Sequence, residues 1–311
     1  MHLNLAHMAY VVAVAKAGSI TGASVEIGIS QPAISAAIRG IEDTFKYKLF
    51  VRNRAKGLSL TPTGRHFVNR AQKLLDEAAA FRDDVQGFGN QIAGEIQVAC
   101  YHVISPYVLP PVFSNLAAQH PNVNVRLHEG SLVDVVNTVK EGTADIAITY
   151  DMFDDSTVNT ERLAAVRPHV LLSQQHPLAG RESLSLDELA KYPFVMLDIP
   201  GVREYYQNLF RARGIQPDVR FRARSLELVR SLVGLNLGYS FALLPIAIKH
   251  SYSGDVIVRR PLSHDVEEAS LALVSPKETQ RPKKIDAFAE ICRVAISEAI
   301  ENHSRTMFDN N

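Results

Sequence analysis

Three polar side chains near the start of the chain are spaced four residues apart, at Gln31, Ser35 and Arg39. A helix places residues with this spacing on one face. Amide, hydroxyl and guanidinium groups are the groups that hydrogen-bond to base edges in the major groove of DNA. A helix that presents them could therefore read a base sequence, although an ordinary helix with a solvated polar face would show the same pattern.

The flanking residues predict a helix-turn-helix that would position this face. Ser19 can cap a short helix over residues 20–27, and Gly28 can end it in a left-handed conformation. Ser30 can cap the next helix, which carries Pro32 in its first turn, where a missing N–H costs nothing. The second helix of such a pair enters the major groove. We expect DNA contacts from Ser30, Gln31, Pro32, Ala33, Ser35, Ala36 and Arg39.

A basic cluster follows, in which five lysines and arginines fall within eleven positions. Two short strand-like stretches, residues 49–51 and 58–60, flank the tip of this cluster and predict a β-hairpin wing. Cations at the tip of a wing would contact phosphates, which gives affinity without base choice. A run of solvated charges is the alternative. The expected phosphate contacts are Arg52, Arg54 and Lys56.

The net charge of the 311-residue chain is zero, which by itself argues against a polyanionic partner. The balance changes when the chain is divided. Residues 1–73 hold ten basic and three acidic side chains, whereas residues 74–311 hold 23 basic and 30 acidic ones. The basic N-terminal region is consistent with binding to nucleic acid, because binding depends on local patches and not on totals.

Composition and motifs limit the class of protein. Cys100 and Cys292 form no paired motif, which fits two buried thiols in a reducing compartment and excludes a disulfide-rich secreted scaffold. The apolar run over residues 8–15 lacks a basic segment before it, so we do not interpret it as a signal peptide. No nucleotide-binding, metalloprotease or hydrolase motif occurs. We expect a cytoplasmic protein without cofactor or metal, and without enzymatic activity.

A coiled-coil helix is predicted after Thr61 and Pro62, which can begin it. Its apolar positions alternate spacings of four and three residues, the period of a helix that packs along another helix. The simplest partner is a second copy of the chain, and burial against the chain's own body is the alternative. The expected seam consists of Phe67, Ala71, Leu74, Ala78, Phe81, Val85 and Phe88.

The remaining residues alternate strands and helices. The order strand–helix–strand–helix–strand over residues 95–149 predicts a parallel, doubly wound sheet, and a second unit of this kind begins near residue 168. A strand at 268–274 could return to the first unit, and a helix over 285–300 closes the chain. The predicted domains are a winged helix-turn-helix (1–62), a linker helix (63–90) and an α/β body (91–311). The body divides into lobe one (95–166 and 266–303) and lobe two (167–265).

Four motifs follow one another over residues 30–64: Ser30 to Ser35 (SQPAIS), Ile41-Glu42, Leu49-Phe50 followed by Arg52, and Leu60 to Gly64 (LTPTG). Together they resemble the LysR-type bacterial transcriptional regulators. The resemblance covers nearly the whole chain. It implies a homodimer through the linker helix, usually paired into a tetramer, and a periplasmic-binding-protein-like domain whose cleft binds a small effector. Ala36 and Ala37 depart from the family, in which a basic or long polar pair is common at these positions.

An effector site is expected where strands end, since ligands bind outside the carboxyl ends of strands in doubly wound sheets. By resemblance, effector contacts fall around Val103, Ser131 and the loop after Leu197. Helices that begin near Ser131, Arg203 and Ser225 would direct N–H groups at an anion, so the sequence favours a small carboxylate. Tyr101, His102 and Phe241 would suit an aromatic portion of it. The candidate residues are Tyr101, His102, Val103, Ser131, Thr149, Asp198, Gly201, Val202, Arg203, Ser225 and Phe241.

The sequence therefore predicts an effector-responsive transcription regulator. Paired N-terminal domains would bind spaced half-sites of double-stranded promoter DNA, and effector binding between the lobes would change their spacing. The output would be altered access for RNA polymerase. The alternative is a two-lobed small-molecule-binding protein, or an enzyme, without DNA readout.

Overall fold

The computed structural model describes residues 4–53, 57–85, 92–153, 155–244, 248–263, 266–277 and 281–308. The chain divides near residue 94 into two compact units. We call the N-terminal unit the head and the second unit the body.

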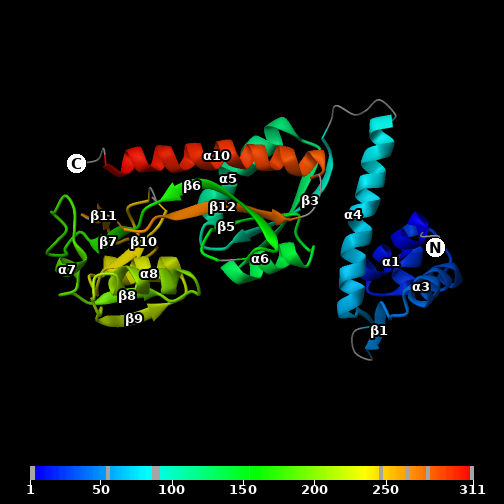
Figure 1. Cartoon of the computed structure of the whole chain (residues 1–311), viewed down its shortest axis with the longest axis horizontal. Helices are drawn as coiled ribbons and strands as arrows, with labels where there is room; N and C mark the ends of the chain where they lie inside the picture. The colour runs from blue at the N-terminus through cyan, green and yellow to red at the C-terminus, as the bar shows by residue number, and fades with distance from the viewer. Residues whose placement is uncertain are drawn as a thin grey trace. The chain divides into compact units, whose positions relative to one another are not determined.

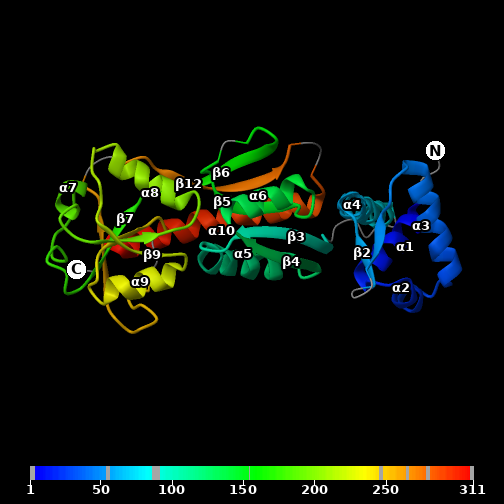
Figure 2. The same cartoon turned by 90° about the horizontal axis from the view of Figure 1, so that it is seen from below.

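The head contains three helices, a hairpin and a long helix (Figures 1 and 2). Its elements are α1 (Leu5–Ala17), α2 (Ile20–Ile27), α3 (Gln31–Phe45), β1 (Phe50–Asn53), β2 (Gly57–Leu60) and α4 (Pro62–Val85). Both predicted ends of α2 are confirmed: the Ser19 hydroxyl accepts a hydrogen bond from the Gly22 N–H, and Gly28 is left-handed with φ 68°. Ser30 occupies the N-cap position of α3, but its side chain makes no capping hydrogen bond, so that detail of the prediction is wrong.

One buried carboxylate joins α3 to the wing. Glu42 is 7% exposed and accepts hydrogen bonds from the Leu49 N–H at 2.8 Å and from Lys48 Nζ at 2.6 Å. Strands β1 and β2 then pair antiparallel, with Val51 opposite Ser59, which confirms the predicted hairpin. The residues at its tip, 54–56, lie outside the described residues. The chain leaves the wing through Thr61, whose hydroxyl accepts from the Gly64 N–H at 2.8 Å and so begins α4.

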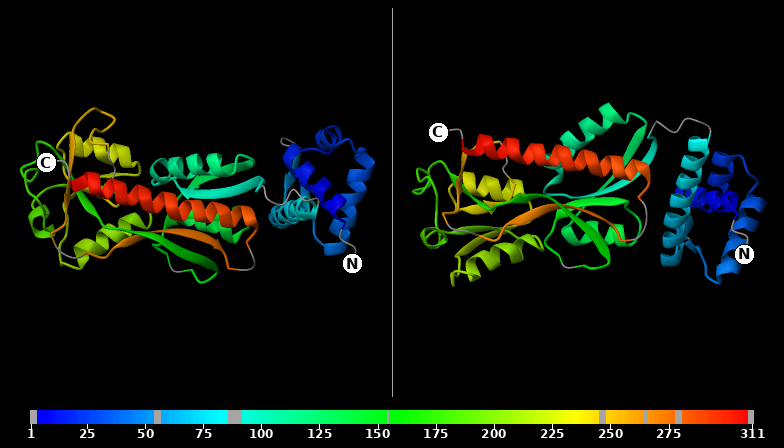
Figure 3. Two further views of the ribbon diagram at one scale, coloured as in Figure 1. Left: turned by 90° about the horizontal axis from the view of Figure 1, so that it is seen from above. Right: turned by 45° about the horizontal axis from the view of Figure 1, so that its top comes forward.

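The first half of the body is built around a five-stranded sheet in the order β4-β3-β5-β12-β6. Helices α5 and α10 share one apolar core with it, and α6 forms a separate core against the sheet; α5 and α10 lie side by side in Figure 3. The bounds are β3 (Gly94–Tyr101), α5 (Ser105–Gln119), β4 (Val123–Gly130), α6 (Leu132–Lys140), β5 (Ile146–Tyr150), β6 (Val158–Val166), β12 (Ala269–Pro276) and α10 (Lys283–Phe308).

The second half of the body has two smaller sheets, β10-β7-β11 and β8-β9. Five aromatic rings, those of Phe194, Tyr206, Phe210, Tyr239 and Phe241, pack together in its core. The bounds are β7 (His169–Ser173), α7 (Leu186–Leu189), β8 (Phe194–Leu197), α8 (Val202–Arg211), β9 (Val219–Ala223), α9 (Leu226–Gly234), β10 (Ser240–Ala242) and β11 (Ile257–Pro261). The strands are thus grouped in the same way as the predicted lobes, and the names lobe one and lobe two are kept for these two halves.

The predicted parallel pairing is confirmed for β3 with β5 and for β8 with β9, but both lobes also contain antiparallel pairs. Strands β3 and β5 are parallel, but β12 runs antiparallel to both β5 and β6, and β7 runs antiparallel to β10 and β11. The reason is the double crossover between lobes. Strand β6 carries the chain out of lobe one and β12 carries it back, so the two strands run in opposite directions side by side. Strands β6 and β11 themselves were not predicted.

Candidate DNA-binding surface and effector pocket

The outer face of α3 carries the residues that the sequence singled out. Gln31, Ala36 and Arg39 are exposed and Ser35 is half-buried, whereas Ile34, Ala37 and Ile38 are buried beneath them. Ser30, Pro32 and Ala33 are also exposed at the N-terminal end of the helix. The helical spacing therefore brings the predicted residues together on one solvent-facing side. Of the two alanines that depart from the family pattern, Ala36 alone lies on this side.

Sequence reasoning missed one neighbour of this surface. The Thr21 hydroxyl of α2 lies 3.3 Å from Gln31 Oε1 and can donate to it. This contact occupies the acceptor of the amide and leaves its NH2 group directed elsewhere. A threonine two residues after the N-cap of the first helix in a helix-turn-helix is the signal that could have identified it.

The wing places Arg52 on β1, with its backbone opposite Leu58. Its side chain, together with Arg54 and Lys56, lies outside the described residues, so these phosphate contacts stay predictions. Lys48 is 70% exposed at the base of the wing while it pairs with Glu42.

The predicted seam of α4 divides into two parts. Phe67 and Ala71 are buried in the head's own core, where Phe67 packs edge-on to the Phe45 ring, so these two positions do not face a second chain. Further along, Leu74 is 42% exposed and Phe81 is 70% exposed, with Ala78 half-buried between them. The side chain of Val85 and all of Phe88 lie outside the described residues. The apolar stripe of α4 is thus buried in the core of the head at its start and exposed to solvent further along the helix.

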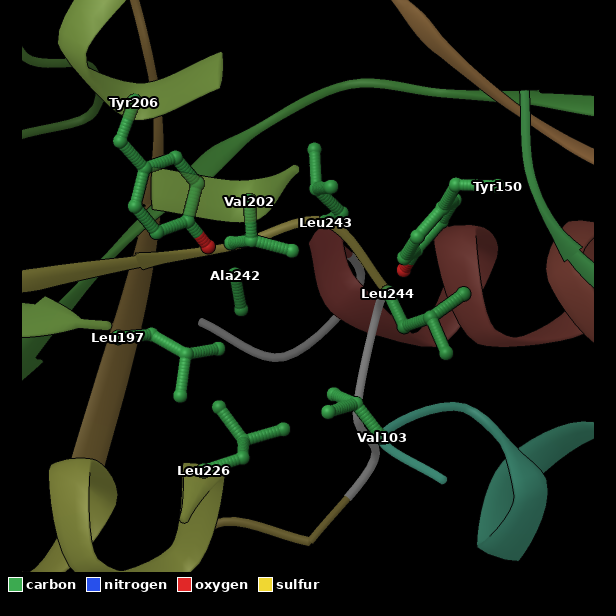
Figure 4. Close-up of a pocket in the computed structure, with 9 residues that line it drawn as sticks. All are labelled: Val103, Tyr150, Leu197, Val202, Tyr206, Leu226, Ala242, Leu243 and Leu244. Carbon is green, nitrogen blue, oxygen red and sulfur yellow. The ribbon is translucent and has the colours of Figure 1, made fainter. Parts of the chain in front are cut away.

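A narrow pocket lies where strands of both lobes end (Figure 4). Two predicted residues, Val103 and Val202, line it. Thr149 and Phe241 are fully buried elsewhere, and their neighbours Tyr150 and Ala242 face the pocket instead, because successive strand residues point to opposite sides. The described residues that line it are Val103, Tyr150, Leu197, Val202, Tyr206, Leu226, Ala242, Leu243 and Leu244.

The other candidate effector residues surround the pocket without lining it. Tyr101 is buried, with its ring 6.0 Å from that of Tyr150. His102 is exposed, and its Nδ1 lies 2.9 Å from the Gly130 carbonyl oxygen, to which it donates. The remaining five belong to helix ends and their caps: Ser131, Asp198, Gly201, Arg203 and Ser225.

Two tyrosine hydroxyls supply the polarity of the pocket. Tyr206 donates to the Phe241 carbonyl oxygen at 2.9 Å. Tyr150 is 2% exposed, and its hydroxyl forms no hydrogen bond with any residue that the structure describes. Burial raises the pKa of Tyr150 and of Tyr206 well above the ordinary value, so both stay neutral at physiological pH. Sequence reasoning chose Thr149 in place of Tyr150, its neighbour on the opposite side of β5, and did not consider Tyr206 on α8.

Neither cysteine is positioned for reactivity. Cys100 and Cys292 are fully buried, and burial raises the pKa of each thiol. In the described part of the chain, no group of three or more metal-ligating side chains is arranged to hold an ion. Nor does any single described helix have the length and apolar character to cross a membrane.

Comparison with known proteins identifies the family. Residues 89–296 match the LysR substrate binding domain, and residues 5–65 match the bacterial regulatory helix-turn-helix protein, lysR family. The first match covers more than half of the chain. The chain therefore belongs to the LysR family, a family of transcriptional regulators and not of enzymes, and it combines a helix-turn-helix with an effector-binding domain.

Individual relatives are consistent with this assignment. The HTH-type transcriptional regulator CysB of Haemophilus influenzae is 29% identical over 230 residues, which cover 71% of this chain and 69% of the relative. The crystal structure of HinK, a LysR family transcriptional regulator from Pseudomonas aeruginosa, is 32% identical with a TM-score of 0.64, covering 94% of this chain and 98% of HinK. Full-length OxyR from Pseudomonas aeruginosa shares the fold, at 24% identity and a TM-score of 0.72 over 94% of this chain and 99% of OxyR.

Proposed function

We propose that this protein binds double-stranded promoter DNA through α3 and the wing of each head. The observation that carries the proposal is the exposed face of α3, on which Gln31, Ser35 and Arg39 stand over a buried apolar stripe. Gln31 and Ser35 contact base edges, and Arg39 contacts a base or a phosphate. Ser30, Pro32, Ala33 and Ala36 lie against the groove. Arg52, Arg54 and Lys56 contact phosphates.

The protein acts as a homodimer, and two dimers pair into a tetramer. Support comes from Leu74 and Phe81, which leave a large apolar area of α4 exposed along one stripe. A second α4 would cover this stripe and place two heads at the spacing of two half-sites. The dimer works in the cytoplasm without a cofactor and without catalysis.

A small effector binds in the pocket of the body. The lining residues come from both lobes, with Val103 and Tyr150 from lobe one and Leu197, Val202 and Leu226 among those from lobe two. A molecule that contacts both lobes stabilises one angle between them. In a tetramer this angle sets the spacing of the heads, the bend of the DNA and, indirectly, access for RNA polymerase.

The test separates base reading from phosphate binding. DNA selected from a random library by the full-length protein is compared with unselected DNA by fluorescence anisotropy at several salt concentrations. Gln31→Ala should reduce the preference for selected DNA by about fivefold to a hundredfold, the equivalent of roughly 1–3 kcal/mol at one base pair. Arg52→Ala should weaken binding to both DNAs and lower the salt slope by about one unit.

Gln119→Ala, at an exposed end of α5 in the body, is the matched control and should change neither quantity. If Gln31→Ala and Arg52→Ala weakened binding to selected and random DNA equally, the assignment of Gln31 to base reading would be wrong. If the wild-type protein showed no preference for any selected sequence, the regulator function itself would fail.

A further inference from the structure

The pocket of the body is lined by carbon atoms and two hydroxyls. Nine described side chains line it, of which seven are aliphatic and none carries a charge. An anion placed there would lose its hydration without gaining a charged partner, which is costly in a buried site. Figure 4 shows the aliphatic side chains of Val103, Val202, Leu226 and Leu244 turned toward the same space.

The helix N-termini that would attract an anion already hold the chain's own carboxylates and hydroxyls. At α6, Asp134 Oδ2 accepts from the Ser131 hydroxyl at 2.7 Å and from its N–H at 3.1 Å. At α8, Glu204 accepts from the Gly201 N–H at 2.5 Å. The Ser225 hydroxyl caps α9. The positive ends of α6 and α8 are therefore each compensated by a carboxylate within the chain.

The cation next to the pocket is also occupied. Arg203 Nη1 lies 2.9 Å from Asp198 Oδ1, and its Nη2 lies 2.5 Å from Glu204 Oε1. One positive charge thus meets two negative ones, so the start of α8 has a net negative charge. His102 uses Nδ1 for the Gly130 carbonyl and lies in solvent outside the lining. These groups do not favour the carboxylate effector that the sequence suggested.

One polar group in the pocket has no partner. Tyr150 is 2% exposed as a residue, its hydroxyl forms no hydrogen bond with a described residue, and the hydroxyl faces the space among the aliphatic side chains (Figure 4). A ligand that brought a hydrogen-bonding atom into this space would give the hydroxyl a partner. Tyr206 is different because its hydroxyl already donates to Phe241.

We propose that the effector is an uncharged, mostly apolar small molecule with a single hydrogen-bonding group, which the Tyr150 hydroxyl contacts. This inference rests on the proposed function, in which the pocket is the effector site. The aliphatic walls select against charge, and Tyr150 selects for one polar atom.

Three probes of nearly equal size test the proposal: benzyl alcohol, toluene and benzoate. Each is titrated into the full-length protein by calorimetry. Benzyl alcohol should bind at least tenfold more tightly than benzoate. Tyr150→Phe removes the hydroxyl and keeps the ring. It should weaken the binding of benzyl alcohol by about fivefold, which corresponds to one hydrogen bond, and leave the affinity for toluene unchanged.

Two variants that each introduce one positive charge provide an independent measurement. Leu226→Arg places a cation at the edge of the pocket and should improve benzoate binding at least tenfold. Leu228 lies two residues further along α9, is 51% exposed and does not line the pocket. Leu228→Arg should therefore leave the affinities for all three probes unchanged. Thermal unfolding of each variant confirms that it is folded before its affinities are compared.

Tighter binding of benzoate than of benzyl alcohol by the wild-type protein would overturn the proposal, as would binding of none of the three probes. An equal loss of toluene and benzyl alcohol in Tyr150→Phe would overturn the role of the hydroxyl. Because these titrations contain no DNA, they fail or succeed separately from the DNA-binding experiment. If the protein preferred selected DNA but bound benzoate more tightly than benzyl alcohol, this inference would be wrong and the proposed DNA-binding function would stand.

Discussion

The head and the body present their candidate sites in opposite ways. In the head, the three side chains proposed to read the groove, Gln31, Ser35 and Arg39, are polar and come from one stretch of nine residues on the outer face of α3. In the body, the pocket is apolar and draws its residues from six separate parts of the chain, from Val103 to Leu244. A single helix can thus present a reading surface by itself, whereas a pocket between lobes depends on the register of several strands.

The largest expected effect is at Gly64, where the first turn of α4 packs against the backbone of Leu49. A Cβ at Gly64 would lie 2.0 Å from the Leu49 carbonyl oxygen, which is backbone and cannot turn aside. Gly64→Ala should therefore destabilise the head by several kcal/mol, on the order of 3 or more. Circular dichroism melts should show an early transition for the head, while benzyl alcohol binding by the body stays intact.

Gly40→Ala is the matched control for this change. A Cβ at Gly40 meets nothing within 4 Å, and the residue lies inside α3, where alanine is favoured over glycine by about 1 kcal/mol. The control should raise the melting temperature slightly. A Gly64→Ala protein that melts like the wild type would show that the contact between the wing and α4 is not required.

A smaller effect is expected at the exposed part of α4. Phe81→Lys should break the dimer, because it places a charge where about 2–3 kcal/mol of aromatic burial per chain is expected. Sedimentation equilibrium should show the mass fall to that of a monomer. Phe81→Leu keeps an apolar side chain and should stay dimeric. An intact dimer in Phe81→Lys would move the interface away from this stripe.

The smallest effect concerns a cap beside the pocket. Hydrogen bonds from the Ser131 hydroxyl and N–H lower the pKa of Asp134 below its ordinary value of 3.8. A lowered carboxyl pKa contributes stability that is present above pH 3.8 and is lost as the pH falls through the folded-state pKa. Asp134→Asn should therefore unfold at a lower temperature than the wild type near pH 6, by a few degrees at most.

The difference in unfolding temperature between the wild type and Asp134→Asn should shrink as the pH falls below about 4, where the wild-type carboxylate becomes protonated. Thermal melts of both proteins between pH 3 and pH 7 measure it. A difference that stays constant over this range would mean that the charge of Asp134 does not contribute, and that the N-terminus of α6 could accept an anion after all.

Prediction from the sequence was accurate where structure is local. The turn between α2 and α3, the exposed face of Gln31, Ser35 and Arg39, and the hairpin after Glu42 follow from caps, glycines and the helical period. Prediction failed where residues distant in sequence must align. Thr149 was chosen in place of Tyr150, and Phe241 in place of Ala242, since the end of a strand does not reveal which of two neighbouring residues faces the pocket.

The sequence by itself determined the family, the order of elements in the head and the basic charge of the head, because motif spacing and helical periodicity are properties of neighbouring residues. Tertiary structure decided three other features. It buried Phe67 and Ala71 within the head, it made β12 antiparallel to β5 and β6, and it formed a pocket without charge beside helix ends that are already capped. All three depend on which distant segments pack together, and this packing fixes which side chains are left for a partner or a ligand.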